Sequence, residues 1–302
     1  MIDVVLQPVD AWPDSGGLII CDTGTFIPGG VGLNTAVTIA RLGGTAALVG
    51  ALGKDAVGRA VVTELDETGV RADGIVYPDG VTTGFCVVGV ARSGERSLAA
   101  HLGANAALSP EQVRWDLMQS GDHLHVGGIF GLPQLRGEGL MEVLERARER
   151  GMSTSTETTW DVSGQWLEGI TESLPFVDVF MTNEVEAAGM TGGALPDVAA
   201  AALAQLGPRI VIVKAGEDGC YAHVEGVTTH FPAYRVAVTD TTGAGDCFCG
   251  GFLYGRDEGR SIEDAARFAN AVGALTCMSL GATKGIPGAA AVESFMRTTE
   301  LR

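Results

Sequence analysis

The stretch Asp240–Asp246, Asp-Thr-Thr-Gly-Ala-Gly-Asp, contains the residues best suited to chemistry. Gly243 and Gly245 bracket the expected start of a helix, and bare glycines let a ligand approach the backbone N–H groups closely. The first turn of a helix has unpaired N–H donors and the positive end of the helix dipole, so it attracts phosphate. Together with Ala244, these residues would form an anion cradle beside the carboxylate of Asp246. Such a cradle suits transfer of a phosphoryl group to a hydroxyl, although an ordinary capped helix start shows the same pattern.

A second glycine-rich stretch, Gly29–Ala36, leads into another expected helix. Gly30 and Gly32 permit close approach of a ligand, and Asn34 offers both donors and acceptors to a polyhydroxy compound. Asn34 fits equally well as an N-cap after a glycine turn. The sequence has no GxxxxGK[ST] loop, no strand-linked GxGxxG, no GxSxG and no HExxH. These absences remove support for P-loop or dinucleotide binding, hydrolase triads and zinc proteases.

The composition limits the class of protein and its partners. Of the 302 residues, 46% are hydrophobic and 19% are charged, so the chain can bury a full core. The formal net charge of −17 argues against nucleic acid or an anionic membrane as a partner. The six cysteines show neither a CxxC pair nor a zinc spacing, and no apolar run approaches the roughly 18 residues of a membrane span. We therefore expect a cytoplasmic protein with reduced thiols.

Strand-like and helical segments alternate along most of the chain. The expected strands are Thr45–Gly50, His123–Val126, Met152–Thr156, Val177–Met181 and Arg209–Lys214. The expected helices are Asn34–Leu42, Gly137–Arg150, Glu184–Met190, Pro196–Leu206, Ala244–Tyr254, Ile262–Ser279 and Ala289–Arg297. This alternation predicts an α/β fold with a mainly parallel sheet, helices on both faces and ligands at the carboxyl ends of the strands. Residues 82–101 instead predict a β-hairpin with its turn at 92–94, either at a sheet edge or as a small lid over a substrate cleft.

The two glycine-rich stretches together resemble the two signature regions of the PfkB, or ribokinase-like, family of carbohydrate kinases. The signature regions here are Gly29–Gly58 and Asp240–Gly251. Minor motifs follow in the family's order at Gly103–Pro110, at Asn183–Glu186 (the family's NxxE) and at Lys214–Gly219 (its TLGxxG loop). The resemblance covers nearly the whole chain. It implies a ribokinase-like three-layer α/β sandwich with a central mainly parallel sheet, as one kinase domain over 1–302 with a β-lid formed by about 3–28 and 82–101.

The resemblance further implies phosphorylation of a hydroxyl of a sugar or sugar-like substrate by ATP with Mg²⁺. Asp246 would be the base, and the amides of Gly243–Asp246 the anion hole. The implied sugar contacts are Asp3, Gly30, Gly32, Asn34 and Asp246. The implied nucleotide contacts are Asn183, Glu186, Lys214, Gly216, Gly219 and Asn270, with Glu186 acting on Mg²⁺ indirectly. The implied K⁺ loop contains Asp240, Thr242, Thr276, Ser279, Gly281 and Gly285. A homodimer through the lid is also implied.

Departures from the family pattern leave the substrate open. Lys214 stands where Thr is usual, Val31 replaces the ribokinase lysine, and His125–Gly128 lacks the acidic residue that ribokinase uses for ribose. Trp160 fits either stacking on a substrate ring or anchoring its own loop. Two alternative functions remain open. One is a nucleoside kinase on the same scaffold, and the other is a catalytically silent sensor of a sugar or nucleotide. The intact Asp246 argues against the sensor, which need not keep a catalytic carboxylate.

The amino terminus departs most from the family. The family opens with a central strand that leads into a substrate-contacting Asp, whereas here only Met1 and Ile2 precede Asp3. We therefore expect a shortened form of a longer protein, through a misassigned start codon, that lacks the first core strand. The two neighbours of that strand would then face a slot, because a central strand cannot be dropped without exposing ladder groups on both sides. The first lid strands are expected near Val4–Leu6 and Leu18–Cys21.

Overall fold

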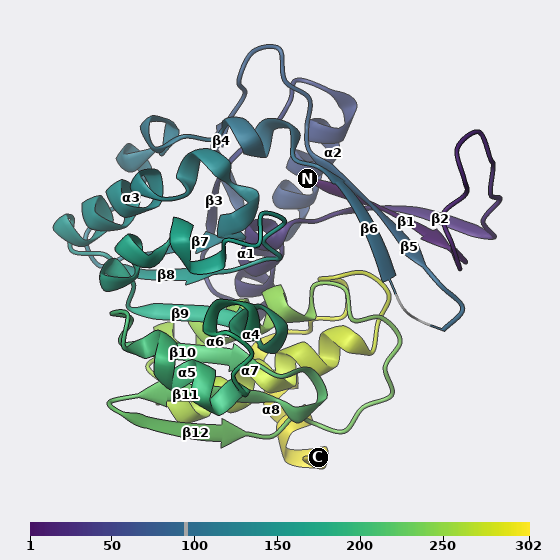
Figure 1. The fold of residues 1–302 in the computed structure, drawn as a ribbon. Coiled ribbons are helices and arrows are strands. Elements are labelled where there is room, and N and C mark those ends of the chain that lie inside the picture. The colour runs from purple at the N-terminus through teal and green to yellow at the C-terminus, as the bar shows by residue number, and fades with distance from the viewer. Residues whose placement is uncertain (94–95) are drawn as a thin grey trace.

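The computed structural model describes residues 1–93 and 96–302 (Figure 1). Its strands are β1 (Ile2–Gln7), β2 (Thr23–Pro28), β3 (Ala47–Ala51), β4 (Arg71–Val76), β5 (Phe85–Val90), β6 (Arg96–His101), β7 (His123–Gly127), β8 (Ser153–Glu157), β9 (Val179–Asn183), β10 (Ile210–Lys214), β11 (Cys220–Val224) and β12 (Val227–Phe231). Its helices are α1 (Val31–Leu42), α2 (Ala56–Thr68), α3 (Glu138–Glu149), α4 (Glu184–Thr191), α5 (Pro196–Ala204), α6 (Ala244–Asp257), α7 (Ile262–Cys277) and α8 (Ala289–Thr298). All the strands and helices of the expected α/β alternation are present, with ends shifted by a few residues, whereas α2, β4 and the β11–β12 hairpin are additional.

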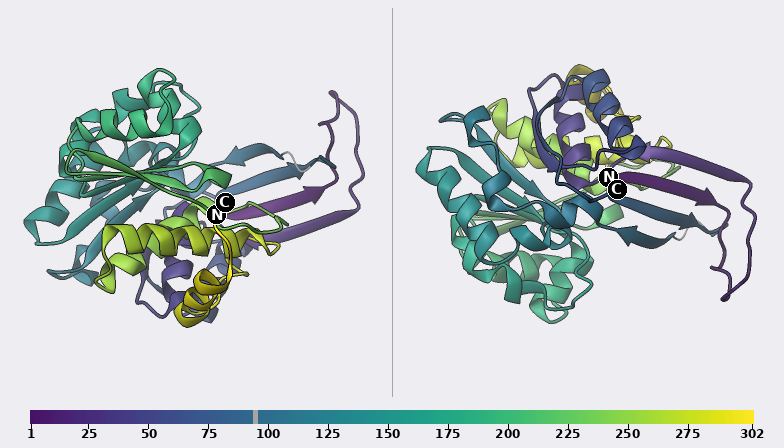
Figure 2. Two further views of the ribbon diagram at one scale, coloured as in Figure 1. Left: turned by 90° about the horizontal axis from the view of Figure 1, so that it is seen from below. Right: turned by 90° about the horizontal axis from the view of Figure 1, so that it is seen from above.

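The main sheet has six strands in the order β12-β11-β10-β9-β8-β7, and β7 to β10 are parallel. Helices α3, α4 and α5 cover one face, and α1, α6 and α7 cover the other (Figure 2). Side chains of a strand point alternately to the two faces. On β9, Phe180 therefore packs with the first group of helices, while Val179 and Met181 pack with the second. Within the described residues, no helix is both long and apolar enough to span a membrane.

A separate four-stranded sheet has the order β2-β1-β5-β6 and projects from the side of the main body (Figure 2). The expected hairpin is confirmed, because β5 and β6 pair antiparallel from Phe85 opposite His101 to Val90 opposite Arg96. Its expected turn lies partly outside the described residues, at position 94. We call this four-stranded sheet the small sheet.

The second strand of the small sheet was expected at Leu18–Cys21, and this prediction is wrong. The strand is Thr23–Pro28, which pairs antiparallel with all of β1, from Gln7 opposite Thr23 to Ile2 opposite Pro28. Leu18 is 85% exposed and belongs to the loop between the two strands. The proline and glycine residues of that loop (Pro8, Pro13, Gly16 and Gly17) favour turns over a paired strand.

The core sheet is in two parts, since β3 and β4 form a two-stranded parallel sheet of their own. In the described part of the chain, β3 pairs only with β4, and β7 pairs only with β8. The expected central sheet is therefore interrupted between β3 and β7.

Candidate active site

Gly243 ends the loop before α6 and takes a left-handed conformation with φ 72°. A Cβ atom at this position would lie 2.3 Å from the Cβ of Ala282, so only glycine fits. The i to i−4 hydrogen bonds of α6 begin with the N–H of Cys247, which donates to the carbonyl of Gly243 at 2.8 Å. The N–H groups of Gly245 and Asp246 precede that bond and have no backbone acceptor among the described residues. Free donors therefore lie where the anion hole is predicted.

Asp246 lies in the first turn of α6 and is held by α1. The Nδ2 of Asn34 donates to Oδ2 of Asp246 at 2.7 Å, and Oγ1 of Thr35 donates to the Asp246 carbonyl at 3.2 Å. The two helices approach closely because Gly250 lacks a Cβ, which would lie 2.7 Å from Cβ of Thr38. Asn34 is 2% exposed, and its Oδ1 has no hydrogen-bond partner in the described structure. The two glycine-rich stretches of the sequence thus meet at one point.

The electrostatic setting of Asp246 favours proton transfer. Burial and, to a smaller extent, the negative charge of Glu157 raise the pKa of Asp246, which is about 7. The hydrogen bond from Asn34 and the positive charge of Lys214 act in the opposite direction. A carboxyl group whose pKa lies near neutrality is well matched to general base catalysis at physiological pH.

Lys214 and Glu157 form a buried ion pair beside this carboxyl group. They end the parallel strands β10 and β8, and the Nζ of Lys214 donates to Oε1 of Glu157. The side chains are only 13% and 2% exposed. The Nζ also lies 3.2 Å from the position that a Cβ on Gly245 would occupy. The lysine ammonium group therefore sits at the first turn of α6, next to the free amides.

The charge of Lys214 is maintained by its neighbours. Burial alone would lower the pKa of Lys214, but the Glu157 carboxylate, through its charge and its hydrogen bond, raises it well above its ordinary value. The Nζ of Lys214 also donates to the Sγ of Cys249 at 3.6 Å. Burial also raises the pKa of Cys249 well above its usual range, so this thiol is neutral at pH 7. Glu157 is thus the negative partner of the lysine. Sequence reasoning missed this role of Glu157, although its position at the end of an expected strand was a usable signal.

Asn183 and Glu186 lie at the carboxyl end of β9, where Asn183 is opposite Lys214 in the sheet. The Oδ1 of Asn183 accepts a hydrogen bond from the N–H of Glu186 at 2.8 Å, so Asn183 is the N-cap of α4. Glu186 is 6% exposed, and its Oε2 accepts from the hydroxyls of Thr158 and Thr182 at 2.6 and 3.3 Å. Within the described residues, no cluster of three or more His, Cys, Asp or Glu could hold a metal by itself.

The predicted nucleotide residues form a loop that requires glycine. Gly219 has φ 94°, and a Cβ there would lie 2.1 Å from the carbonyl oxygen of Phe231. Gly216 has φ 53° in the same loop. Asn270 on α7 uses its Nδ2 to donate to the carbonyls of Phe231 and Pro232, at 2.9 and 3.1 Å. These contacts hold the backbone after β12, and the contact of Asn270 with the nucleotide stays a prediction.

The predicted cation residues gather around Asp240. Its Oδ1 accepts from the N–H and hydroxyl of Thr242 at 2.9 and 2.7 Å, and its Oδ2 accepts from the N–H of Gly281 at 3.1 Å. Burial by itself would raise the pKa of Asp240, but these hydrogen bonds and the charge of Arg96 lower it below its ordinary value. The guanidinium group of Arg96, on β6, donates to Oγ1 of Thr242 at 3.0 Å. The small sheet therefore contacts this loop directly.

The adjoining segment supplies the other predicted cation residues. The N–H groups of Thr239 and Asp240 donate to the carbonyl of Cys277, at 2.7 and 3.2 Å, which fixes the two segments together. The N–H of Ser279 donates to the carbonyl of Thr276 at 3.2 Å. A Cβ on Gly285 would lie 2.7 Å from Oγ of Ser279, so the backbone closes tightly at this point.

The predicted sugar contacts come from β1 and the start of α1. A Cβ on Gly29 would lie 2.6 Å from Oδ2 of Asp3, and Gly30 has φ 101°. Burial raises the pKa of Asp3, while the charge of the amino terminus lowers it. The charge of Asp3 in turn raises the pKa of Asp246, so the two carboxyl groups share one region. Gly32 faces Leu48 of β3 instead, because a Cβ there would lie 3.6 Å from that side chain.

Trp160 was expected either to stack on a substrate or to anchor its loop. It is 60% exposed and packs edge-on against Trp166, with ring centroids 5.3 Å apart. Trp166 in turn packs edge-on against Phe130 at 6.0 Å. These contacts fit the anchoring role, and the stacking role stays a prediction.

Comparison with known proteins defines the class of protein. The model of the pfkB family of carbohydrate kinases matches residues 1–289, and the chain therefore belongs to this family. A probable fructokinase-5 from Arabidopsis thaliana is 28% identical over 96% of this chain and 95% of its own length. A ribokinase from Thermotoga maritima superposes with a TM-score of 0.82 at 28% identity, covering 98% of this chain and 96% of the other. The same coverage and TM-score hold, at 25% identity, for a fructokinase from Vibrio cholerae in its fructose-, ADP- and calcium-bound form. The chain is a carbohydrate kinase with a ribokinase-like fold.

Proposed function

We propose that this kinase transfers the γ-phosphoryl group of ATP to a hydroxyl of a free sugar, with fructose as the first candidate. The proposal is carried by one observation: the Asp246 carboxylate, whose pKa is about 7, lies beside free helix amides and is held by Asn34. Because Oδ1 of Asn34 is buried without a partner in the described structure, it is available to a substrate hydroxyl. The choice of fructose rests on the fructokinases among the relatives.

Asp246 accepts the proton of the attacking hydroxyl in this mechanism. Asn34 orients the carboxylate through Nδ2, and the amides of Gly243–Asp246 face the oxygen atoms on which negative charge develops. Lys214 adds a fixed positive charge at the same helix turn. Asp3 would contact sugar hydroxyls from the small sheet, which would cover the sugar as a lid.

The donor set fits a magnesium–nucleotide complex. Asn183 and Glu186 offer oxygen atoms of the kind that Mg²⁺ prefers, and they lie at the carboxyl end of β9 next to Lys214. Mg²⁺ would neutralise phosphate charge when bound with ATP. Since one Glu186 oxygen already accepts two hydroxyl bonds, we assign Glu186 an indirect role through water.

The test is an ATP-consumption assay against fructose, ribose, other pentoses and hexoses, and nucleosides. We expect fructose to give the highest kcat/KM. The highest kcat/KM on a nucleoside would replace the sugar assignment with the alternative activity, and turnover of none of these substrates would favour a silent sensor. The contacts of Trp160 with Trp166 do not favour a base-bearing substrate.

Potassium is expected to raise the activity relative to sodium or a bulky organic cation. Asp240 and the 276–285 segment supply oxygen atoms close to the anion hole, where a bound cation would fix the orientation of the amides. Steady-state rates in the three chloride salts measure the effect, and Asp240→Asn should remove most of it. Equal wild-type rates in all three salts would eliminate the cation site.

We also expect a homodimer formed through the small sheet. Its edge strands β2 and β6 carry exposed apolar side chains, with Phe26 70% and Leu98 65% exposed. Sedimentation at micromolar concentration should show a dimer, and Phe26→Ser with Leu98→Ser should give a monomer. Val227→Ser, at a residue 63% exposed on β12, is the matched control and should leave the dimer intact. A monomeric wild-type protein would contradict this prediction.

A further inference from the structure

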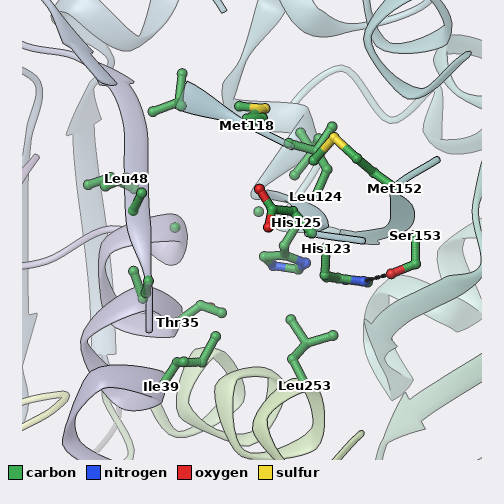
Figure 3. Close-up of a pocket in the computed structure, with 18 of the residues that line it drawn as sticks. Thr35, Ile39, Leu48, Met118, His123, Leu124, His125, Met152, Ser153 and Leu253 are labelled. Carbon is green, nitrogen blue, oxygen red and sulfur yellow. Dashed lines mark hydrogen bonds between the residues drawn. The ribbon is translucent and has the colours of Figure 1, made fainter. Parts of the chain in front are cut away.

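A row of polar side chains runs along β7 and β8 toward the candidate active site. In the parallel register of the two strands, His123 lies opposite Ser153 and His125 lies opposite Ser155, while Glu157 follows at the end of β8. Because alternate residues of a strand point to the same face, all five side chains lie on one face of the main sheet. Figure 3 shows both histidines lining a cavity together with residues of α1 and α6.

Three hydrogen bonds connect the first four of these side chains. The Nδ1 of His123 lies 2.7 Å from Oγ of Ser153, and its Nε2 lies 2.7 Å from Oγ of Ser155. The Nδ1 of His125 lies 2.8 Å from the same Ser155 hydroxyl. Ser155 is fully buried, and a hydroxyl has a single proton to donate. The Ser155 hydroxyl therefore donates to one of the two rings and accepts from the other.

The row ends at two buried polar atoms that face each other. The Nε2 of His125 lies 3.9 Å from Oε2 of Glu157, and the two side chains are 11% and 2% exposed. Neither atom has a hydrogen-bond partner in the described structure, whereas Oε1 of Glu157 accepts from Lys214. Buried polar atoms in folded proteins almost always have a partner. The terminal torsion of a glutamate is soft, so a small rotation turns Oε2 toward the ring.

The charge of Glu157 determines the donor in every bond of the row. A carboxylate only accepts, so His125 must direct an Nε2–H toward it and leave Nδ1 as an acceptor. The Ser155 hydroxyl then donates to Nδ1 of His125, and it accepts from an Nε2–H of His123. The Ser153 hydroxyl in turn donates to Nδ1 of His123. All four hydrogens point along the row toward Glu157.

Both rings are neutral at pH 7, as this assignment requires. Burial lowers the pKa of His123 to about 4, although the charges of Asp178 and Asp257 act in the opposite direction. Burial and, to a smaller extent, the positive charges of His123 and Lys214 lower the pKa of His125, which is about 3. A neutral ring carries one N–H and one acceptor nitrogen.

We propose that His125 is a positioning residue of this kinase, which donates its Nε2–H to Glu157 and is itself oriented by Ser155 and His123. The bond holds the Glu157 carboxylate in place for Lys214. It thereby keeps the lysine ammonium group at the first turn of α6. The inference rests on the proposed role of Lys214 at the phosphate site.

The first test determines the tautomers of the two rings. Long-range proton–nitrogen correlation spectra of the wild-type protein distinguish Nε2–H from Nδ1–H, and His123→Gln and His125→Gln assign the signals. We expect a neutral Nε2–H tautomer for both histidines at pH 7. An Nδ1–H tautomer or a charged ring at His125 would overturn the proposal. Because the spectra need no turnover, this result is independent of whether the proposed substrate and mechanism are correct.

Variants of His125 test the effect on catalysis. His125→Leu removes the donor and should lower kcat by about tenfold, while His125→Gln keeps an N–H donor and should retain most of the activity. The KM values should change little, because His125 acts through Glu157 and not on a substrate. His223→Leu is the matched control, since His223 is 5% exposed on β11 and bonds the Thr228 hydroxyl. It should lower stability without lowering kcat.

The same substitution in a second background separates positioning from support of the fold. In Glu157→Gln the carboxylate is absent, so adding His125→Leu should have no further effect on kcat. A tenfold loss in both backgrounds would mean that His125 only supports the fold. A wild-type kcat for His125→Leu alone would remove the positioning role altogether.

Discussion

Replacement of Asp246 by Asn is expected to lower kcat by about 10²–10⁴-fold, the usual contribution of a general base. The affinity for ATP should change little, because helix amides and Lys214, not this carboxylate, face the phosphates in the proposed mechanism. Asn also keeps the size of the side chain and accepts the bond from Asn34 Nδ2 through its oxygen. Steady-state kinetics and ATP titration measure the two effects. A variant with near wild-type kcat would show that Asp246 is not the base.

The pH dependence of the wild-type enzyme gives an independent check. Because the pKa of Asp246 is raised to about 7, kcat/KM should fall as the pH decreases below 7 and the base becomes protonated. The free energy of unfolding changes with pH in the opposite direction to kcat/KM. A raised carboxyl pKa means that the fold favours the protonated form, so stability is lost as the pH rises through about 7. Asp246→Asn should therefore melt higher than the wild type at pH 8, and the difference should shrink at pH 5.

The start of α6 and its partner on α1 could be predicted from the sequence because both depend on local signals. Gly243 is needed where the chain turns with a positive φ, and Asn34 follows the second glycine-rich stretch. The local pattern could not show that these stretches touch. That inference came from the family resemblance, and the 2.7 Å contact between Asn34 and Asp246 agrees with it.

Other features depend on the register of distant strands, which short patterns do not encode. Glu157 and Lys214 lie 57 positions apart, and only the parallel order β8-β9-β10 brings their ends together. The position of β2 was missed for a related reason. Its apolar residues Phe26 and Ile27 are short signals next to the equally apolar Leu18–Cys21, and only pairing with β1 distinguishes the two segments.

Replacement of Lys214 by Met is expected to have two large effects, one on stability and one on catalysis. The methionine leaves the Glu157 carboxylate, 2% exposed, without its cation, and breaking a buried pair in this way costs about 3–5 kcal/mol. It also removes a fixed charge from the first turn of α6, for which a loss of about 10²–10³-fold in kcat is typical. Chemical denaturation and steady-state kinetics measure the two effects. Lys54→Met is the matched control, since that side chain is 68% exposed, and it should change neither.

The double variant Lys214→Met with Glu157→Gln separates these two roles. Removing both charges leaves no unpaired ion in the interior, so the free energy of unfolding should return toward that of the wild type. The catalytic defect should persist, because the positive charge at the helix turn is still missing. If the double variant regains activity together with stability, Lys214 acts only as the structural partner of Glu157. Persistent loss of activity in a stable double variant makes the lysine part of the phosphate site, where Thr is usual in the family.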